Sequence, residues 1–180
     1  TSPFDSPNNG FYSGYIQVDS GGALVVDGII DSESGALYLQ DGSLQGAGSV
    51  SMIQIYFSGQ SGESFTVGDI DLTILSGEGF AAVQDLGIKV FDGTNVTVGG
   101  SFQLSNGQDN FSLDNGAHIT VTSGGTLAIF DGHGIGSGGG LVTVEAGGQL
   151  YRATNTGVST IEAAVDLNGS VIVQSGTLAL

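Results

Sequence analysis

The sequence predicts an all-β protein: a right-handed single-stranded parallel β-helix (β-solenoid) of about seven to nine irregular, Gly-rich coils, at roughly 20 residues per coil. Three observations support this fold class: a phrase that recurs along the chain, apolar residues that alternate with polar ones, and the composition. The chain has 180 residues with 33 Gly, 2 Pro and no Cys. Glycine supplies positive φ at tight corners, and proline would remove ladder hydrogen bonds from interior strands.

The recurring phrase combines two short strands with a glycine corner. It reads apolar, any, apolar, two polar or small residues, Gly-Gly, any, Leu, and it spans 16–24, 119–127 and 142–150. A shortened form spans 171–178. The last three copies therefore begin at positions 119, 142 and 171. These intervals are near one β-helix coil each, with loops of variable length.

The residues that flank each glycine corner alternate with period two. Ile119 and Val121, and then Leu127 and Ile129, occupy every second position, so one side of each strand is buried. A sandwich or barrel also uses short strands and Gly turns, but a corner repeated inside a fixed phrase favours a solenoid. Only the stretch 78–86 is plausible as a short helix.

The chain divides into an arm and a body. Both prolines lie within 1–13, which we interpret as an N-terminal arm or cap. The parallel β-helix occupies 14–180, and its least regular part is 50–85. The aromatic residues of that part suggest a larger loop or a wider section of the core: Tyr56, Phe57, Phe65 and Phe80.

The charge excludes two classes of partner. The net charge is −16, and Lys89 and Arg152 are the only basic residues apart from two histidines. Nucleic-acid binding needs clustered Lys and Arg to displace counterions, and anionic membrane surfaces attract the same residues. No apolar run reaches the ~18 residues of a membrane helix. We therefore expect no nucleic acid and no membrane insertion, with most acids on solvated faces.

The repeated phrase resembles a known architecture. The runs 119–127 and 171–180 resemble the parallel β-helix repeats of bacterial autotransporter passenger domains and related large surface adhesins, over about half of the chain. The resemblance implies a structural or adhesive segment of a secreted or cell-surface bacterial protein, without catalysis. Expected partners are neighbouring coils of a longer chain, surface glycans or host proteins. No functional residue carries over, because the shared motif is a corner.

An alternative function follows from the last residues. The sequence stops at 178–180 in a strand pattern without a polar cap, and an uncapped β-helix end exposes backbone groups and apolar surface. Either the chain is cut from a longer protein, or it is a self-assembling extracellular fibre subunit that stacks end to end on like subunits.

A second alternative is a polysaccharide-active enzyme. The segment 132–138 resembles the Gly-His-Gly segment of polygalacturonases, which would give Asp131 and His133 catalytic roles. Glycoside hydrolysis requires two carboxylates across the scissile bond, and no adjacent second Asp or Arg-x-Lys follows here. We therefore predict that the chain is not an enzyme, with no catalytic residue and no organic cofactor.

Calcium is the one metal that the sequence suggests. Asp69 and Asp71 are spaced to share one face of a strand, and Asp109 and Asp114 form a second cluster. Carboxylates are the ligands that Ca²⁺ prefers, but no EF-hand loop is present, so these four are weak candidates. The threonines of the repeats, Thr120 among them, do not suggest a regular outward array.

Overall fold

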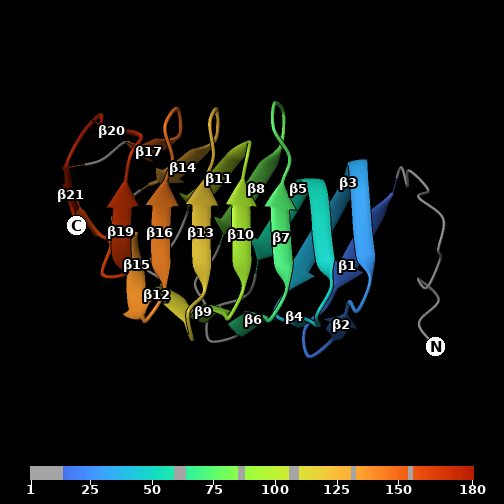
Figure 1. The fold of residues 1–180 in the computed structure, drawn as a ribbon. Helices are drawn as coiled ribbons and strands as arrows, with labels where there is room; N and C mark the ends of the chain where they lie inside the picture. Colours follow the sequence, from blue (N-terminus) through green and yellow to red (C-terminus); the bar gives the residue numbers. More distant parts are fainter. Residues whose placement is uncertain (1–13, 59–63, 85–87, 106–109, 131–132, 154–155) are drawn as a thin grey trace.

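The computed structural model describes residues 14–58, 64–84, 88–105, 110–130, 133–153 and 156–180. The described chain is all-β, and its parallel strands stack as a β-solenoid of about six turns. This confirms the predicted fold class. Figure 1 shows the coils side by side, with β1 (Tyr15–Val18) and β21 (Thr177–Ala179) at opposite ends of the stack. In this described part no helix is long and apolar enough to cross a membrane.

Each coil contributes strands to three faces, which we name from Figure 1. The front face holds β7 (Asp71–Ile74), β10 (Asn95–Val98), β13 (His118–Val121), β16 (Leu141–Val144) and β19 (Ala164–Leu167). The rear face holds β1 (Tyr15–Val18), β8 (Phe80–Gln84), β11 (Ser101–Ser105), β14 (Thr126–Ile129), β17 (Gln149–Arg152) and β20 (Ser170–Val173). The base holds β2 (Ala23–Val25), β4 (Ser43–Gln45), β6 (Ser64–Gly68), β9 (Ile88–Asp92), β12 (Asn110–Asp114) and β15 (Gly134–Gly138).

Two long strands join the front and rear faces into one sheet. β3 (Ile29–Gln40) and β5 (Ser49–Ser58) each run across the corner between them. The first part of β5 pairs with β7 on the front face, and its second part pairs with β8 on the rear face. At the far end of the stack, β18 (Val158–Thr160) pairs with β21 (Thr177–Ala179).

The coil length is set by the register of the front face. Asn95 pairs with His118, His118 with Leu141, and Leu141 with Ala164, so the same interval separates each pair and these coils are equal in length. That interval is longer than the coil assumed from the sequence, because three strands and three corners need more chain. The prediction of seven to nine coils was therefore too high, and the described coils begin only at position 14.

The recurring phrase does not always occupy the same corner. The copies at 119–127 and 142–150 stack in register, joining front to rear strands, with Ile119 opposite Val142. Val171, however, pairs with Leu150, so the phrase at 171–178 leaves the rear face instead. The phrase at 16–24 does the same between β1 and β2. The interval from 142 to 171 is therefore more than one coil, because it includes a step from one face to the next.

The glycine pair of the phrase meets two different requirements. Gly124 has a φ of +84°, and a Cβ there would meet nothing within 4 Å. A Cβ on Gly125 would clash with the carbonyl oxygen of Val98 in the coil below. The first glycine thus provides the left-handed backbone, and the second lets adjacent coils approach.

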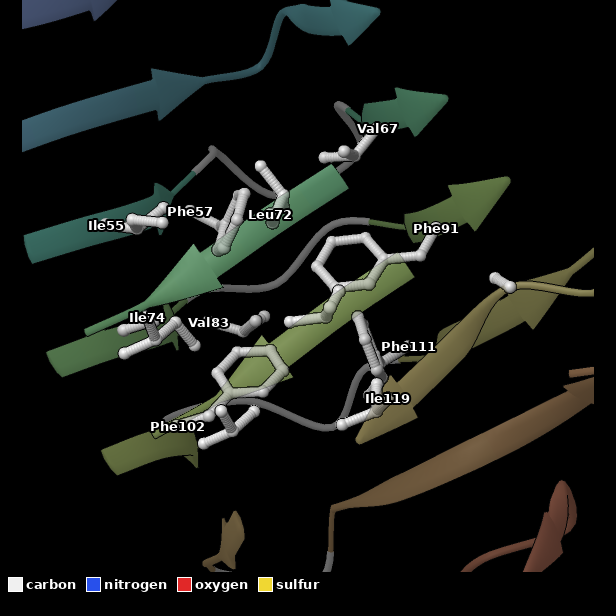
Figure 2. Close-up of a cluster of buried hydrophobic side chains, with 14 of the residues drawn as sticks. Ile55, Phe57, Val67, Leu72, Ile74, Val83, Phe91, Phe102, Phe111 and Ile119 are labelled. Atoms are coloured by element: carbon white, nitrogen blue, oxygen red, sulfur yellow. The ribbon is translucent and has the colours of Figure 1, made fainter. Parts of the chain in front are cut away.

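The core lies between the three faces and is apolar. Figure 2 shows the rings of Phe91, Phe102 and Phe111 turned toward one another among aliphatic side chains. The ring centroid of Phe91 lies 4.9 Å from that of Phe111 and 5.5 Å from that of Phe57. Each coil therefore buries its inward side chains against the coils above and below, as in other solenoids.

The region 50–85 contains strands β5 to β8 with an interruption at 59–63, which lies outside the described residues. Its inward rings, Phe57 and Phe65, are stacked at 5.0 Å. The suggested helix at 78–86 is wrong for the described part. Phe80–Gln84 form strand β8, because Ala81 and Val83 alternate into the core and sheet partners flank the strand on both sides.

Candidate functional site

The rear face differs from the rest of the molecule in its charge. The chain has 18 acidic residues, yet none lies in the rear-face strands, including the second parts of β3 and β5. The one charged residue there, Arg152, is fully buried. The outer surface of these strands is therefore built from uncharged amides, hydroxyls, small residues and aromatic rings, with the aliphatic Ile172 in β20.

Four aromatic side chains form a row across the outside of this face. Tyr38 and Tyr56 are in register and stack at 4.9 Å with their planes 9° apart. Tyr15 meets Tyr38 edge-on at 6.0 Å, and Phe80 lies 5.9 Å from Tyr56. Tyr15 is 69% exposed and Tyr38 is 37% exposed. We call Tyr15, Tyr38, Tyr56 and Phe80 the aromatic row.

Glutamines flank the aromatic row. Gln17 stands in register with Tyr38, and Gln54 with Phe80, and both amides are exposed. The Gln17 Nε2 donates to the Asp19 carboxylate at the end of the strand. Further along the face, the Tyr151 hydroxyl donates to the Gln174 amide oxygen at 2.5 Å. Amides both donate and accept hydrogen bonds, so the face is polar without being charged.

The front face carries a column of hydroxyl groups. Thr73, Thr97, Thr120 and Thr143 lie opposite one another on consecutive strands, preceded by Ser51. The sequence-based expectation that the threonines would not form a regular array was wrong for this column. The reason is that coils of unequal length still place their outward positions in register.

The neighbouring column on the front face is chemically mixed. It contains Asp71, Asn95, His118 and Leu141 in register. The Asn95 Nδ2 donates to the Asp71 Oδ1 at 2.9 Å, and the His118 Nε2 lies 2.8 Å from the Thr143 Oγ1. The hydroxyl column is therefore one residue wide, bordered by charged and apolar groups.

Three of the calcium candidates, Asp69, Asp71 and Asp114, lie at or next to the corner between the base and the front face. Asp69 and Asp71 do not share a strand face as predicted: Asp69 has a φ of +51° at the corner, and the buried Ile70 separates it from β7. Asp114 ends β12, and Asp109 lies outside the described residues. Asp92, missed from the sequence, stacks between the other corner acids and accepts from the Asn115 Nδ2. Within the described ranges, no three His, Asp or Glu side chains are grouped to hold a metal ion.

His133 lies inside the solenoid, at the corner between the rear face and the base. It is 7% exposed and lines a recess of about 10 Å³ together with Lys89 and Ser105. That volume accommodates about one water molecule, so a sugar ring does not fit in it. Asp131 lies outside the described residues, and the enzyme alternative stays a prediction.

Both basic residues of the chain are buried. Lys89 is 1% exposed and lies in register between Phe65 and Phe111 of the adjacent strands. Arg152 is fully buried, and its Nη1 donates to the Ala153 carbonyl oxygen. The sequence-based interpretation did not predict this burial for either residue. The burial of Lys89 could have been predicted from the sequence, because Lys89 and Phe91 are two residues apart in one strand and therefore point to the same side of it.

Comparisons of the chain with protein-family models, with curated proteins and with solved structures found no significant match. The resemblance to autotransporter passenger domains therefore stays a prediction, and the solenoid itself rests on the strand pairing described above.

Proposed function

We propose that this chain is a structural or adhesive β-solenoid segment of a bacterial protein that is secreted or displayed on the cell surface, and that it has no catalytic role. The observation that carries the proposal is the set of flat outer faces formed by strands in register around an apolar core. The hydroxyl column of the front face repeats one chemistry at the strand spacing of about 4.8 Å, which suits contact with an extended surface.

The interior supports the rod part of the proposal. Most inward side chains are fully buried, and aromatic and aliphatic groups continue from coil to coil. Close-packed interiors have low compressibility. Each coil contacts only its neighbours, so the shape extends along one axis and holds the outer faces in fixed positions.

The composition is compatible with a location outside the cell as well as with one inside it. The absence of Cys makes folding independent of disulfide formation, and the charge of −16 keeps such rods apart from one another in solution. The resemblance to exported passenger domains favours the location outside the cell.

Bead adhesion under flow tests the adhesive part. Beads coated with the chain should resist detachment from cultured epithelial cells and from polysaccharide-coated glass several-fold better than beads coated with another acidic protein. Heat-unfolded chain on the same beads is the control, because it keeps the charge and loses the faces. Equal detachment of all three beads from both surfaces would leave only a spacer role.

A second candidate function is a fibre subunit that stacks end to end. The last described coil exposes Leu167, Val171 and Val173 by 41%, 37% and 45%, although the same positions in earlier coils are buried, so either a following coil of a longer chain or the first coil of another subunit would fit there. Parallel strands of another subunit would cover these side chains and pair with the β19 and β20 backbone.

Sedimentation velocity tests the fibre candidate. The chain should form higher species as its concentration rises, and the double variant Val171→Asp, Val173→Asp should remain monomeric. Thr97→Asp, on the side of the rod, is the matched control and should associate like the unmodified chain. A monomer at all concentrations would contradict stacking.

A further inference from the structure

We propose that the N-terminal part of the rear face, built around the aromatic row, binds an uncharged polysaccharide. The inference rests on the proposed adhesive function and assigns it a site and a ligand class. Two independent observations meet there: a run of aromatic rings, of which Tyr15 and Tyr38 are exposed, and strands that carry no acidic residue, the nearest acid being Asp19 just after β1.

The rings provide apolar contact of the kind that sugars use. A pyranose ring carries C–H groups on its faces and hydroxyls at its edge, so it packs on aromatic surface while hydrogen bonding sideways. Tyr15 stands at 87° to Tyr38 and is the most exposed ring of the row, which leaves ring area for such packing. Tyr38 and Tyr56 stack on each other, so they present ring edges and hydroxyls instead.

The amides supply the hydrogen bonds. Gln17 and Gln54 are exposed next to the row. The Gln54 amide offers two N–H donors and one carbonyl acceptor, whereas the Gln17 Nε2 already donates to the Asp19 carboxylate and keeps one N–H and the carbonyl oxygen for a ligand. A sugar hydroxyl both donates and accepts, so neutral amides and phenols match it better than carboxylates, which only accept. Successive strands repeat at about 4.8 Å, close to the length of one sugar unit in an extended chain.

The charge distribution selects the uncharged class of polymer. An acidic polysaccharide approaching a chain of net charge −16 is repelled, and the described rear face offers it no exposed cation, since Arg152 is buried. A neutral polymer meets no such barrier. A second copy of this chain is the other possible occupant, and the acids that surround the face disfavour it.

Affinity electrophoresis of the full chain tests the site. Gels would contain hydroxyethyl cellulose, galactomannan or alginate, and the migration of the protein would be compared with its migration in a plain gel. We expect retardation by at least one neutral polymer and none by alginate. The double variant Tyr15→Ala, Tyr38→Ala should weaken the retardation about tenfold or more, because it removes the exposed ring contacts.

Three matched variants control the assignment. Tyr151→Ala removes a tyrosine from the distal part of the same face, and Thr97→Ala alters the front face, so neither should change the affinity. Gln54→Glu keeps the shape of the side chain but loses its donors and adds a charge, and it should weaken binding. Circular dichroism of each variant establishes that the coils are intact, and Tyr15→Ala alone suffices if the double variant unfolds.

Four outcomes would overturn the inference: no retardation by either neutral polymer, retardation by alginate, equal loss of affinity in the Tyr151→Ala variant, or concentration-dependent self-association abolished by the tyrosine substitutions. These outcomes are separable from failure of the proposed function. Beads that adhere to cells while the gels show no retardation leave the adhesive role standing without this site, whereas beads that adhere to neither surface remove the adhesive role itself.

Discussion

The coils from β5 to β12 and the coils from β13 to β19 solve the same packing problem with different residues. The first group fills its interior with five phenylalanines, and its front-face repeats differ in length, with partners in register at positions 49, 71, 95 and 118. The second group uses Ile, Leu and Val, and its partners at positions 118, 141 and 164 are equally spaced. On the front face, coils of unequal length keep the strands of the first group in register, and coils of equal length do so in the second. Near the base the second group varies too, because Ile135 pairs with Ile161 over a longer interval.

This difference explains where the recurring phrase is visible. The Gly-Gly corner with its flanking pairs stays recognisable at 119–127 and 142–150, where the core is aliphatic and regular. In the aromatic coils the corners vary and the phrase degenerates, although the strands pair equally well. A solenoid can thus keep its register while its sequence repeat fades.

The largest effect should come from the centre of the aromatic coils. Phe91 contacts the rings of Phe57, Phe65, Phe102 and Phe111, so Phe91→Ala should lower the free energy of unfolding by about 3–5 kcal/mol. Urea denaturation measures this loss.

The Lys89 amine provides a local measurement of the same change. It is the only lysine and is 1% exposed, so amine acylation reports opening of the aromatic coils. Phe91→Ala should accelerate the labelling of Lys89 strongly, and Leu150→Ala in the aliphatic coils should do so much less. Equal acceleration would mean that the two groups of coils open as one unit.

A smaller effect should come from the corner of the aliphatic coils. Gly125→Ala places a Cβ against the Val98 carbonyl oxygen of the adjacent coil, which forces the coils apart and should cost about 1–3 kcal/mol. Gly124→Ala is the control at the adjacent position: its Cβ has open space, and only the positive φ opposes it. A larger loss in Gly124→Ala than in Gly125→Ala, measured by urea denaturation, would contradict the close-approach argument.

The smallest effect should come from a single hydrogen bond in the aromatic coils. The buried Thr94 Oγ1 donates to the Val67 carbonyl oxygen at 2.8 Å, so Thr94→Val should destabilise the chain by about 1 kcal/mol. Thr97→Val, in the outward hydroxyl column, should change stability by no more than about 0.5 kcal/mol. Thermal unfolding of the two variants side by side distinguishes them.

The fold was predictable because its determinants are local. Ile119, Val121, Leu127 and Ile129 alternate around a glycine corner, and this pattern alone specifies a buried inner side and a tight turn. The number of coils was not predictable. The motif that begins at Val171 has the same pattern as the copies at 119 and 142 but lies at a different corner, and the pattern alone does not show to which face a strand belongs.

The candidate site was harder to predict for a related reason. Tyr15, Tyr38, Tyr56 and Phe80 have no common spacing in the sequence and meet only through the register of unequal coils. The Asp69–Asp71 pairing failed because Asp69 has a positive φ at the corner between β6 and β7 and belongs to neither strand. Outward surfaces of a solenoid depend on pairing between coils, which a single sequence does not display.

The burial of both basic residues affects how long the rod survives among proteases. Trypsin-like enzymes cut after lysine or arginine, so this chain offers them the bonds after Lys89 and Arg152, and both side chains are inside the solenoid. Cleavage must therefore wait until those coils open. The lifetime of the protein in a trypsin-rich environment then measures the opening of the coils that hold Lys89 and Arg152.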